Sequence, residues 1–132
     1  MKGFKSNIEK DTLSNSNFRH VLYTGKKSQL VLMSLKPGEE IGEEVHETVD
    51  QFFRFEEGNG IVSIDGIEQN VADGDAVIVP AGARHNVINA SETMNLKLYT
   101  IYSPPEHQDG TVRKTKADAL ANPEEFDGKT TE

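Results

Sequence analysis

The sequence contains no cysteine among its 132 residues, which excludes disulfide bonds, thiolate metal sites and thiol nucleophiles. It also lacks an apolar run long enough to span a membrane as a helix. Residues 1–17 are polar and do not contain the apolar region of a secretory signal. Together these absences predict a cytoplasmic protein.

Basic residues are outnumbered, with 14 lysines and arginines against 22 aspartates and glutamates, a formal net charge of −8 and a pI near 5.0. A chain of this charge repels phosphate backbones and anionic lipids, so neither nucleic acid nor a membrane is an expected partner. We expect a small molecule instead. The length fits one domain over residues 1–132 with one buried core.

Short apolar and β-branched segments alternate with turns rich in glycine, proline and aspartate. Asp65-Gly66 is a two-residue hairpin signal, and residues 76–79 are apolar throughout, as in a buried strand. Eight or more short strands with such turns predict an all-β antiparallel barrel or jelly roll. The predicted strands are residues 18–23, 29–35, 44–48, 51–56, 61–64, 67–71, 76–79, 85–88 and 96–102.

The two ends of the chain differ from this predicted barrel, which occupies about residues 18–105. Residues 1–17 form a polar N-terminal arm, and residues 111–132 form a polar, charged C-terminal tail. Within the tail, residues 116–122 favour one or two helical turns. From about Asp127 we expect the chain to be mobile.

Two groups of regularly spaced residues lie within the strand pattern. Residues two apart on a strand share a face, so Glu44 and His46 point the same way and Glu43 points away. His85 arrives about forty residues later, and a closed sheet brings such distant segments together. The first group is Gly38, Glu44, His46, Gln51 and Gly58, and the second is Gly74, Pro80, Gly82, His85 and Asn89.

These two groups resemble the paired motif of the cupin superfamily, G-x5-H-x-H-x4-E-x6-G followed by G-x5-P-x-G-x2-H-x3-N. The second group matches at every fixed position, whereas the first has Glu44 in place of a histidine and Gln51 in place of the glutamate. The resemblance implies a small single-domain (type 2) cupin with a double-stranded β-helix fold. It also implies a mononuclear metal site with the ligands Glu44, His46, Gln51 and His85.

A set of two imidazoles, one carboxylate and one amide oxygen suits one divalent transition metal, Mn, Fe, Ni or Zn. Glu44, His46 and His85 alone compose the 2-His-1-carboxylate triad of non-haem Fe(II) chemistry. Two alternatives to ligation stay open at this stage. Glu44 belongs to an acidic cluster that can simply be a solvated face, and Gln51 can be a buried amide with satisfied hydrogen bonds.

A glutamine at position 51 cannot shuttle protons as a glutamate can, so a catalytic base must come from elsewhere. The candidates are Glu44, His20, His107, Tyr99 and Tyr102. Because Lys97 should face solvent, the alternate residues of strand 96–102 point inward, which makes Tyr102 a pocket residue. We therefore predict Glu44 and Tyr102 as catalytic residues, and His20 and His107 as surface histidines near the barrel mouth.

The predicted function is that of a metal-dependent enzyme acting on a small oxygenated metabolite, such as a sugar or sugar-acid isomerase or tautomerase that uses the metal as a Lewis acid. The alternatives are an Fe(II) dioxygenase and a non-catalytic module that binds a metal or small ligand. Single-domain relatives commonly dimerise through N-terminal strands, so we expect a homodimer. Alternatively, strand 18–23 only closes its own sheet.

Overall fold

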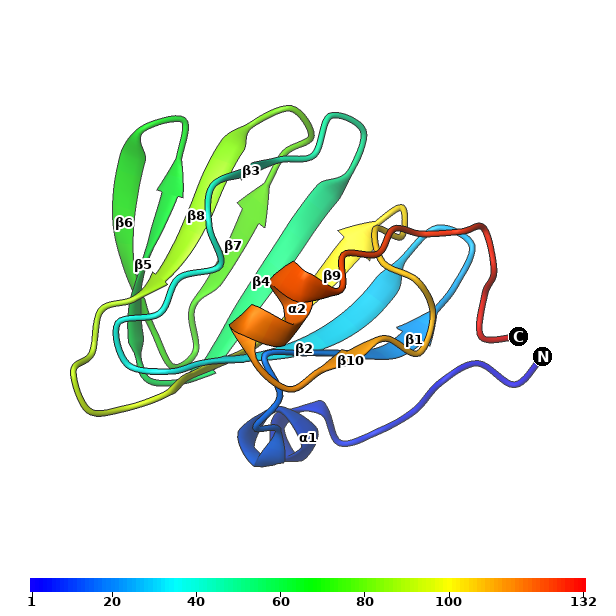
Figure 1. Ribbon diagram of the computed structural model, residues 1–132, viewed down its shortest axis with the longest axis horizontal. Coiled ribbons are helices and arrows are strands. Elements are labelled where there is room, and N and C mark those ends of the chain that lie inside the picture. Colours follow the sequence, from blue (N-terminus) through cyan, green and yellow to red (C-terminus); the bar gives the residue numbers. More distant parts are fainter.

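The computed structural model describes residues 1–132 as two antiparallel sheets with a short helix near each end of the chain (Figure 1). No helix is long and apolar enough to cross a membrane. The elements are α1 (Ile8–Ser14), β1 (Arg19–Thr24), β2 (Gln29–Leu35), β3 (Glu44–Val45), β4 (Asp50–Glu57), β5 (Asn59–Ile64), β6 (Ile67–Ala72), β7 (Ala76–Val79), β8 (Arg84–Asn89), β9 (Leu96–Ser103), β10 (Val112–Arg113) and α2 (Lys116–Ala121).

The strand order confirms the predicted all-β jelly roll. The larger sheet has six strands in the order β10-β1-β2-β9-β4-β7, and the smaller has four in the order β3-β8-β5-β6. The predicted strands all occur, and most of their ends lie within two residues of the prediction. The exception is segment 44–48, in which only Glu44–Val45 forms a ladder. The prediction that residues 76–79 form a buried strand is wrong: β7 is the edge strand of the larger sheet, and of its four residues only Val79 is buried.

The core fills the space between the two sheets, because one face of nearly every strand is apolar. On β9 the buried residues alternate as predicted, and Leu96 and Leu98 lie in the core beside Phe53 and Phe55 of β4. Towards the other end of β9 the inward positions become polar: Thr100 and Tyr102 are buried there. The same sheet therefore supplies an apolar core at one end and a polar wall at the other.

Two glycines show how closely the β4–β5 connection approaches the start of β9. Gly58 has φ +95° and faces the Asn95 carbonyl, while a Cβ at Gly60 would lie 2.8 Å from Leu96 Cδ2 and 2.9 Å from the Ile88 carbonyl oxygen. A side chain at either position would collide with packed atoms. The motif glycine at position 58 therefore serves the fold.

Both ends of the chain are more structured than predicted. The N-terminal arm contains α1, whose N-cap Asn7 accepts a 3.1 Å hydrogen bond from the Lys10 N–H. Lys97 of β9 donates to the Leu13 carbonyl (2.8 Å) at the end of this helix. Local periodicity gave no sign of α1, because its seven residues are mostly polar.

The C-terminal tail returns to the barrel instead of extending into solvent. Residues 116–121 form α2, as predicted, and β10 adds two residues to the edge of β1. The prediction of a mobile end from Asp127 is wrong, since Thr131 N–H bonds the Thr24 carbonyl (2.9 Å) and Tyr23 donates to Glu132 (2.7 Å). In Figure 1 the orange and red segment runs back across the strands of the larger sheet.

Candidate metal centre

Three side chains with metal-binding atoms meet where β3 and β8 pair. Glu44 on β3 lies directly opposite His85 on β8 in the antiparallel register, so their side chains share a face. His46 follows β3 by one residue. The ligand atoms of Glu44, His46 and His85 all lie within 4.8 Å of one another, a spacing that lets three groups contact one ion.

The Pro80-Ala81-Gly82 turn, which precedes His85, is hydrogen-bonded to the segment that carries His46. The Gly82 N–H donates to the His46 carbonyl (2.8 Å), and the Ala81 N–H donates to Asp50 Oδ1 (2.8 Å). Gly82 has φ +89°, a conformation that favours glycine. The turn of the second motif therefore holds the backbone of the first in place.

His85 is buried and oriented by the backbone. Its Nδ1 lies 3.1 Å from the Ala83 carbonyl oxygen, which accepts a hydrogen bond only if Nδ1 carries the proton. The Nε2 lone pair is then free for another partner. A ring fixed through one nitrogen to a backbone carbonyl is the usual arrangement of a metal-binding histidine.

His46 lies between two carboxylates. Its Nδ1 is 3.4 Å from Glu106 Oε1 and its Nε2 is 2.9 Å from Glu44 Oε2. Contact with Glu106, and secondly with Glu44, raises the pKa of His46 to about 9, against the opposing effect of burial. The contact with Glu44 is an ion pair and not an aligned hydrogen bond, since Nε2 is buried without a hydrogen-bond partner. The imidazole of His46 is therefore protonated at neutral pH in the metal-free protein.

The titration of Glu44 follows from the same contacts. Burial alone raises the pKa of this carboxyl, but the contact with His46 and the nearby positive charges outweigh burial and lower it below its usual value. Glu44 is therefore ionised at neutral pH. A charged carboxylate at this position is ready to bind a cation.

Gln51 places an amide on the inner face of β4, where it is 2% exposed. Its Nε2 donates to Thr100 Oγ1 (3.0 Å), and its Oε1 is buried with no hydrogen-bond partner. A buried carbonyl oxygen without a partner is unfavourable by about 1–3 kcal/mol, and a cation offsets that penalty. Two unpartnered atoms, Gln51 Oε1 and His46 Nε2, together with an ionised Glu44, fit a divalent metal.

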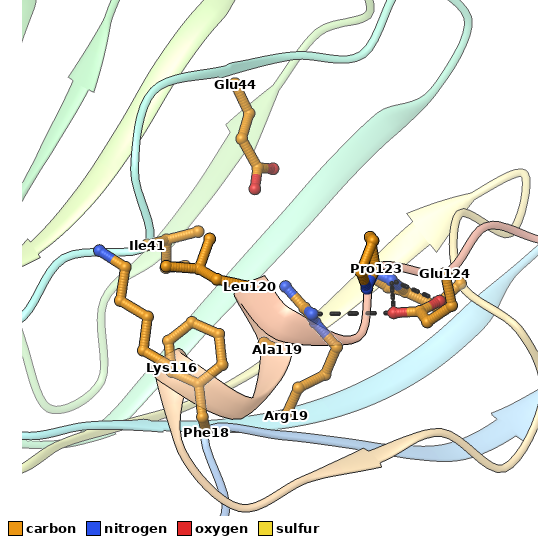
Figure 2. A pocket seen from close by; sticks show the side chains of 10 residues that line it. Phe18, Arg19, Ile41, Glu44, Lys116, Ala119, Leu120, Pro123 and Glu124 are labelled. Carbon is orange, nitrogen blue, oxygen red and sulfur yellow. Dashed lines mark hydrogen bonds and ion pairs between the residues drawn. The ribbon is translucent and has the colours of Figure 1, made fainter.

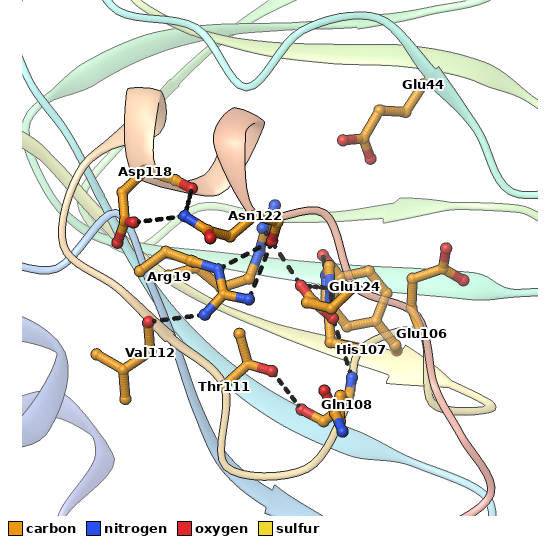
Figure 3. A network of polar contacts seen from close by, with 12 residues as sticks. Arg19, Glu44, Glu106, His107, Gln108, Thr111, Val112, Asp118, Asn122 and Glu124 are labelled. Carbon is orange, nitrogen blue, oxygen red and sulfur yellow. Dashed lines mark hydrogen bonds and ion pairs between the residues drawn. The ribbon is translucent and has the colours of Figure 1, made fainter.

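Tyr102 lies opposite Gln51 across the β4–β9 ladder and begins a chain of polar contacts. Its hydroxyl is 3.1 Å from His107 Nε2. His107 Nδ1 in turn is 3.0 Å from Glu124 Oε1, and Figure 3 shows these two side chains together. Since Glu124 can only accept, His107 carries its proton on Nδ1 and accepts from Tyr102 at Nε2. Burial raises the pKa of Tyr102 far above its usual value, so the phenol stays protonated and can donate but not act as a base at neutral pH.

A cavity of about 200 Å³ adjoins this cluster. Glu44 and His107 line it together with Phe18 and Arg19 at the start of β1, and α2 and the residues after it form the opposite wall. Figure 2 shows the Glu44 carboxylate pointing toward the hollow from one side and Arg19 from the other. The C-terminal tail thus encloses the space beside the candidate ligands.

The family model described as "Cupin domain" matches residues 31–102, which include β2 to β9 and all four candidate ligands. The chain belongs to the cupin superfamily. The match ends at Tyr102, so β1 and the C-terminal tail lie outside it.

Relatives of this cupin share much more than the matched segment. The protein YrkC of Bacillus subtilis is 52% identical over 126 residues, which is 91% of this chain and 67% of YrkC. The crystal structure of BH2720 from Bacillus halodurans is 45% identical, with a TM-score of 0.88 over 92% of this chain and 96% of that chain. KdgF from Halomonas sp. shares the fold at 20% identity, with a TM-score of 0.65 over 79% of this chain and 94% of that chain.

Two predicted base candidates of this cupin lie away from the site. His20 is on the opposite face of β1 from the buried Arg19 and borders a different hollow, between α1 and the outer face of the sheet. Tyr99 lies opposite Arg54 on the outer face of the larger sheet, where its ring contacts Phe52. The inward alternation of β9 and β1 excludes both side chains from the pocket.

The sequence did not point to Arg19, Glu106 or Glu124, and the surface position predicted for His107 is wrong. Arg19 was not singled out, although alternation along β1 places it inward with Val21. His107 is buried, not at the surface as predicted, because Gln29 accepts from its N–H (2.9 Å) and donates to its carbonyl (2.7 Å). Glu106 and Glu124 carry no local signal, since their partners lie elsewhere in the chain.

Proposed function

We propose that this cupin is a divalent-metal-dependent enzyme that isomerises or tautomerises a small oxygenated metabolite. The observation that carries the proposal is the buried, unpartnered Gln51 Oε1 beside the Glu44, His46 and His85 cluster: Gln51 pairs across the sheet with Tyr102, whose ring lies 5.9 Å from the ring of His46. An apolar residue would fill that position at less free-energy cost in a protein that binds no cation. The presence of an amide there supports a metal site.

Glu44, His46, Gln51 and His85 are the proposed ligands, and the donor set suits Mn, Fe, Ni or Zn. When bound, the metal would supply Lewis-acid polarisation of a substrate carbonyl. Gln51, with no acidic proton, would hold the site without taking part in proton transfer. The ionised Glu44 would balance one of the two positive charges.

The acid–base groups of the proposed reaction are His107 and Tyr102. His107 lines the cavity, and Glu124 fixes its tautomer, so its Nε2 could accept a substrate proton only when the Tyr102 hydroxyl turns its own proton from Nε2 toward the substrate. Tyr102 stays protonated and can donate. His107→Gln is expected to lower turnover more than metal affinity, and to shift the pH profile, because the residue is not a proposed ligand.

Metal content tests the proposal first. Untagged protein should contain one divalent metal per chain by elemental mass spectrometry, and His85→Ala should lose it while keeping its melting temperature within a few degrees. His20→Ala is the matched control, since it removes a histidine outside the site. Metal at the wild-type level in His85→Ala would overturn the ligand assignment, and metal-free wild type after reconstitution would leave a binding module.

The triad composition favours one alternative reaction, an Fe(II)-dependent dioxygenase, because Glu44, His46 and His85 supply two histidines and one carboxylate within 4.8 Å. Assays with candidate sugars and sugar acids under strict anaerobiosis separate the two reactions. Turnover without dioxygen supports the isomerase. Turnover that requires dioxygen, with iron in the site, supports the alternative.

We also propose that the protein is a homodimer. β1 pairs with β2 on one edge and for two residues with β10 on the other. Further along that second edge the Val21 N–H bonds the Thr111 carbonyl and the Thr24 carbonyl accepts from the Thr131 N–H, so little free edge is left for a partner's strand. The outer face of the larger sheet instead presents Phe52 next to Ile78 and Ile101, with Ile78 66% exposed. Light scattering should report a dimer that Ile78→Lys disrupts and that Ile67→Lys, at an exposed site on β6, leaves intact.

A further inference from the structure

Arg19 is a buried cation with unusually few partners. The residue is 9% exposed, its Nε is buried without a hydrogen-bond partner, and its ion pair with Glu124 spans 3.8 Å from NH1 to Oε1. The guanidinium also lies 5.4 Å from the centre of the Phe18 ring. A buried charge normally has its hydrogen bonds satisfied, because desolvation without them is costly.

Glu124 does not neutralise Arg19 through an aligned contact. Its two oxygens are taken by shorter contacts, from His107 Nδ1 (3.0 Å) to Oε1 and from the Gln108 N–H (3.0 Å) to Oε2. The contact with Arg19 is the longest of the three. Most of the guanidinium donors therefore remain available to a ligand in the cavity.

The cavity places this free guanidinium opposite Glu44, the one candidate metal ligand that lines it. Arg19 and Glu44 line the same hollow of about 200 Å³ and approach it from different sides (Figure 2). Apolar groups of Phe18, Ile41 and Leu120 complete much of the wall. A molecule in this space would lie between the Glu44 carboxylate, and any metal bound to it, and the Arg19 guanidinium.

We propose that Arg19 binds the carboxylate of a small organic acid, which makes the substrate of this cupin a monocarboxylate of a size that fits beneath α2. The proposal rests on the proposed function for the other end of the substrate. A planar carboxylate matches the guanidinium fork with two parallel hydrogen bonds. A phosphate ester matches the fork too, but as a dianion it is repelled more strongly by Glu44 and Glu124, which line the same cavity.

Binding of two matched ligand pairs tests the proposal: D-glycerate against glycerol, and D-galacturonate against D-galactose. Each pair differs in a carboxylate at one end. Titrations of zinc-loaded and metal-free protein are followed by calorimetry and by the NMR signal of the Arg19 Nε–H, which reports contact without any turnover. Glycerol 3-phosphate is the phosphate probe.

The variants are Arg19→Met, Arg19→Lys and the control Arg84→Met, which removes an arginine whose side chain is exposed on the other side of β8. We expect at least one acid to bind more tightly than its neutral partner and to shift the Arg19 signal. Arg19→Met should weaken binding of that acid by about tenfold to a hundredfold and should not weaken zinc binding, because it removes a positive charge near Glu44. The affinity of Arg19→Lys for the acid should lie between those of the wild type and Arg19→Met. The affinity of Arg84→Met should match that of the wild type.

Several results would overturn the proposal. With the wild type, these are equal binding of an acid and its neutral partner, no binding of either acid, and tighter binding of glycerol 3-phosphate than of glycerate. With the variants, it is an unchanged affinity for the acid in a folded Arg19→Met or Arg19→Lys. Failure of the metal site gives a different pattern. In that case zinc does not bind the wild type, yet the acid still shifts the Arg19 signal in metal-free protein.

Discussion

The carboxylates beside His46 should determine how many protons the protein releases when it binds a metal. In the metal-free protein His46 is held between Glu106 and Glu44, and these contacts raise its pKa to about 9. A metal can bind His46 only in its neutral form, so binding must expel this proton. Glu106→Gln removes the carboxylate with the larger effect and leaves the proposed ligands unchanged.

The size of the effect follows from the titration curve. At pH 8 a histidine with a pKa of about 9 is roughly 0.9 protonated, whereas one at the usual 6.5 is roughly 0.03 protonated. Because Glu106 has the largest effect on this pKa, the protonated fraction of His46 in Glu106→Gln should lie between these two values. The wild type should therefore release more protons than the variant, by a fraction of a proton that cannot exceed about 0.9.

Zinc titration calorimetry at pH 8 in two buffers of different ionisation enthalpy measures the number of protons released. Glu125→Gln is the control, because it removes one negative charge at an exposed position in the same tail. The apparent zinc affinity of the wild type should also rise by about tenfold per pH unit from pH 7 until about pH 9. Equal proton release by wild type and Glu106→Gln would refute the assignment of the raised pKa to Glu106.

Three further predictions concern the same residues and the packing around them. The raised pKa of His46 stabilises the metal-free protein fully below about pH 6.5, and this contribution to the free energy of unfolding is lost as the pH rises through about 9. Urea unfolding at pH 6 and pH 9.5 should show the loss. In Glu106→Gln the difference between the two pH values should be smaller. Gln51→Glu should bind zinc more tightly, because it adds a charged ligand, and unchanged affinity in a competition assay would mean that position 51 does not reach the metal. Gly60→Ala should lower the free energy of unfolding by about 1–3 kcal/mol, since its Cβ would lie 2.8 Å from Leu96 Cδ2; a wild-type urea midpoint would contradict this packing.

The barrel and one wall of the site could be predicted because the information is local. Alternation along a strand is a property of neighbouring residues, and it placed Gln51 on β4 and Tyr102 on β9 inward. The turns carry their own residue preferences, so most of the predicted strand ends lay close to the observed ones. The spacing of Glu44 and His46 likewise needed only the two-residue period of a strand.

The wall of the site that contains His107 and Glu124 could not be predicted in this way, because its contacts join segments far apart in the chain. His107 is buried by Gln29, 78 residues away, and its ring is held by Glu124. A polar tail is usually solvated, and composition alone predicts that state. Here the polar residues of the tail face the polar mouth of a barrel, so the same composition is compatible with burial.

The two departures from the usual cupin motif have a combined electrostatic consequence. With glutamine at position 51 and glutamate at position 44, the proposed ligand set still contains one carboxylate, but that carboxylate lies at the edge of the cavity and not at the buried position 51. An anionic substrate would therefore meet a negative charge beside the metal. Arg19, across the same cavity, supplies the opposite charge in a chain with a net charge of −8. The motif changes and the buried arginine thus explain each other, and the loss of Arg19 should matter more for acids than for neutral ligands.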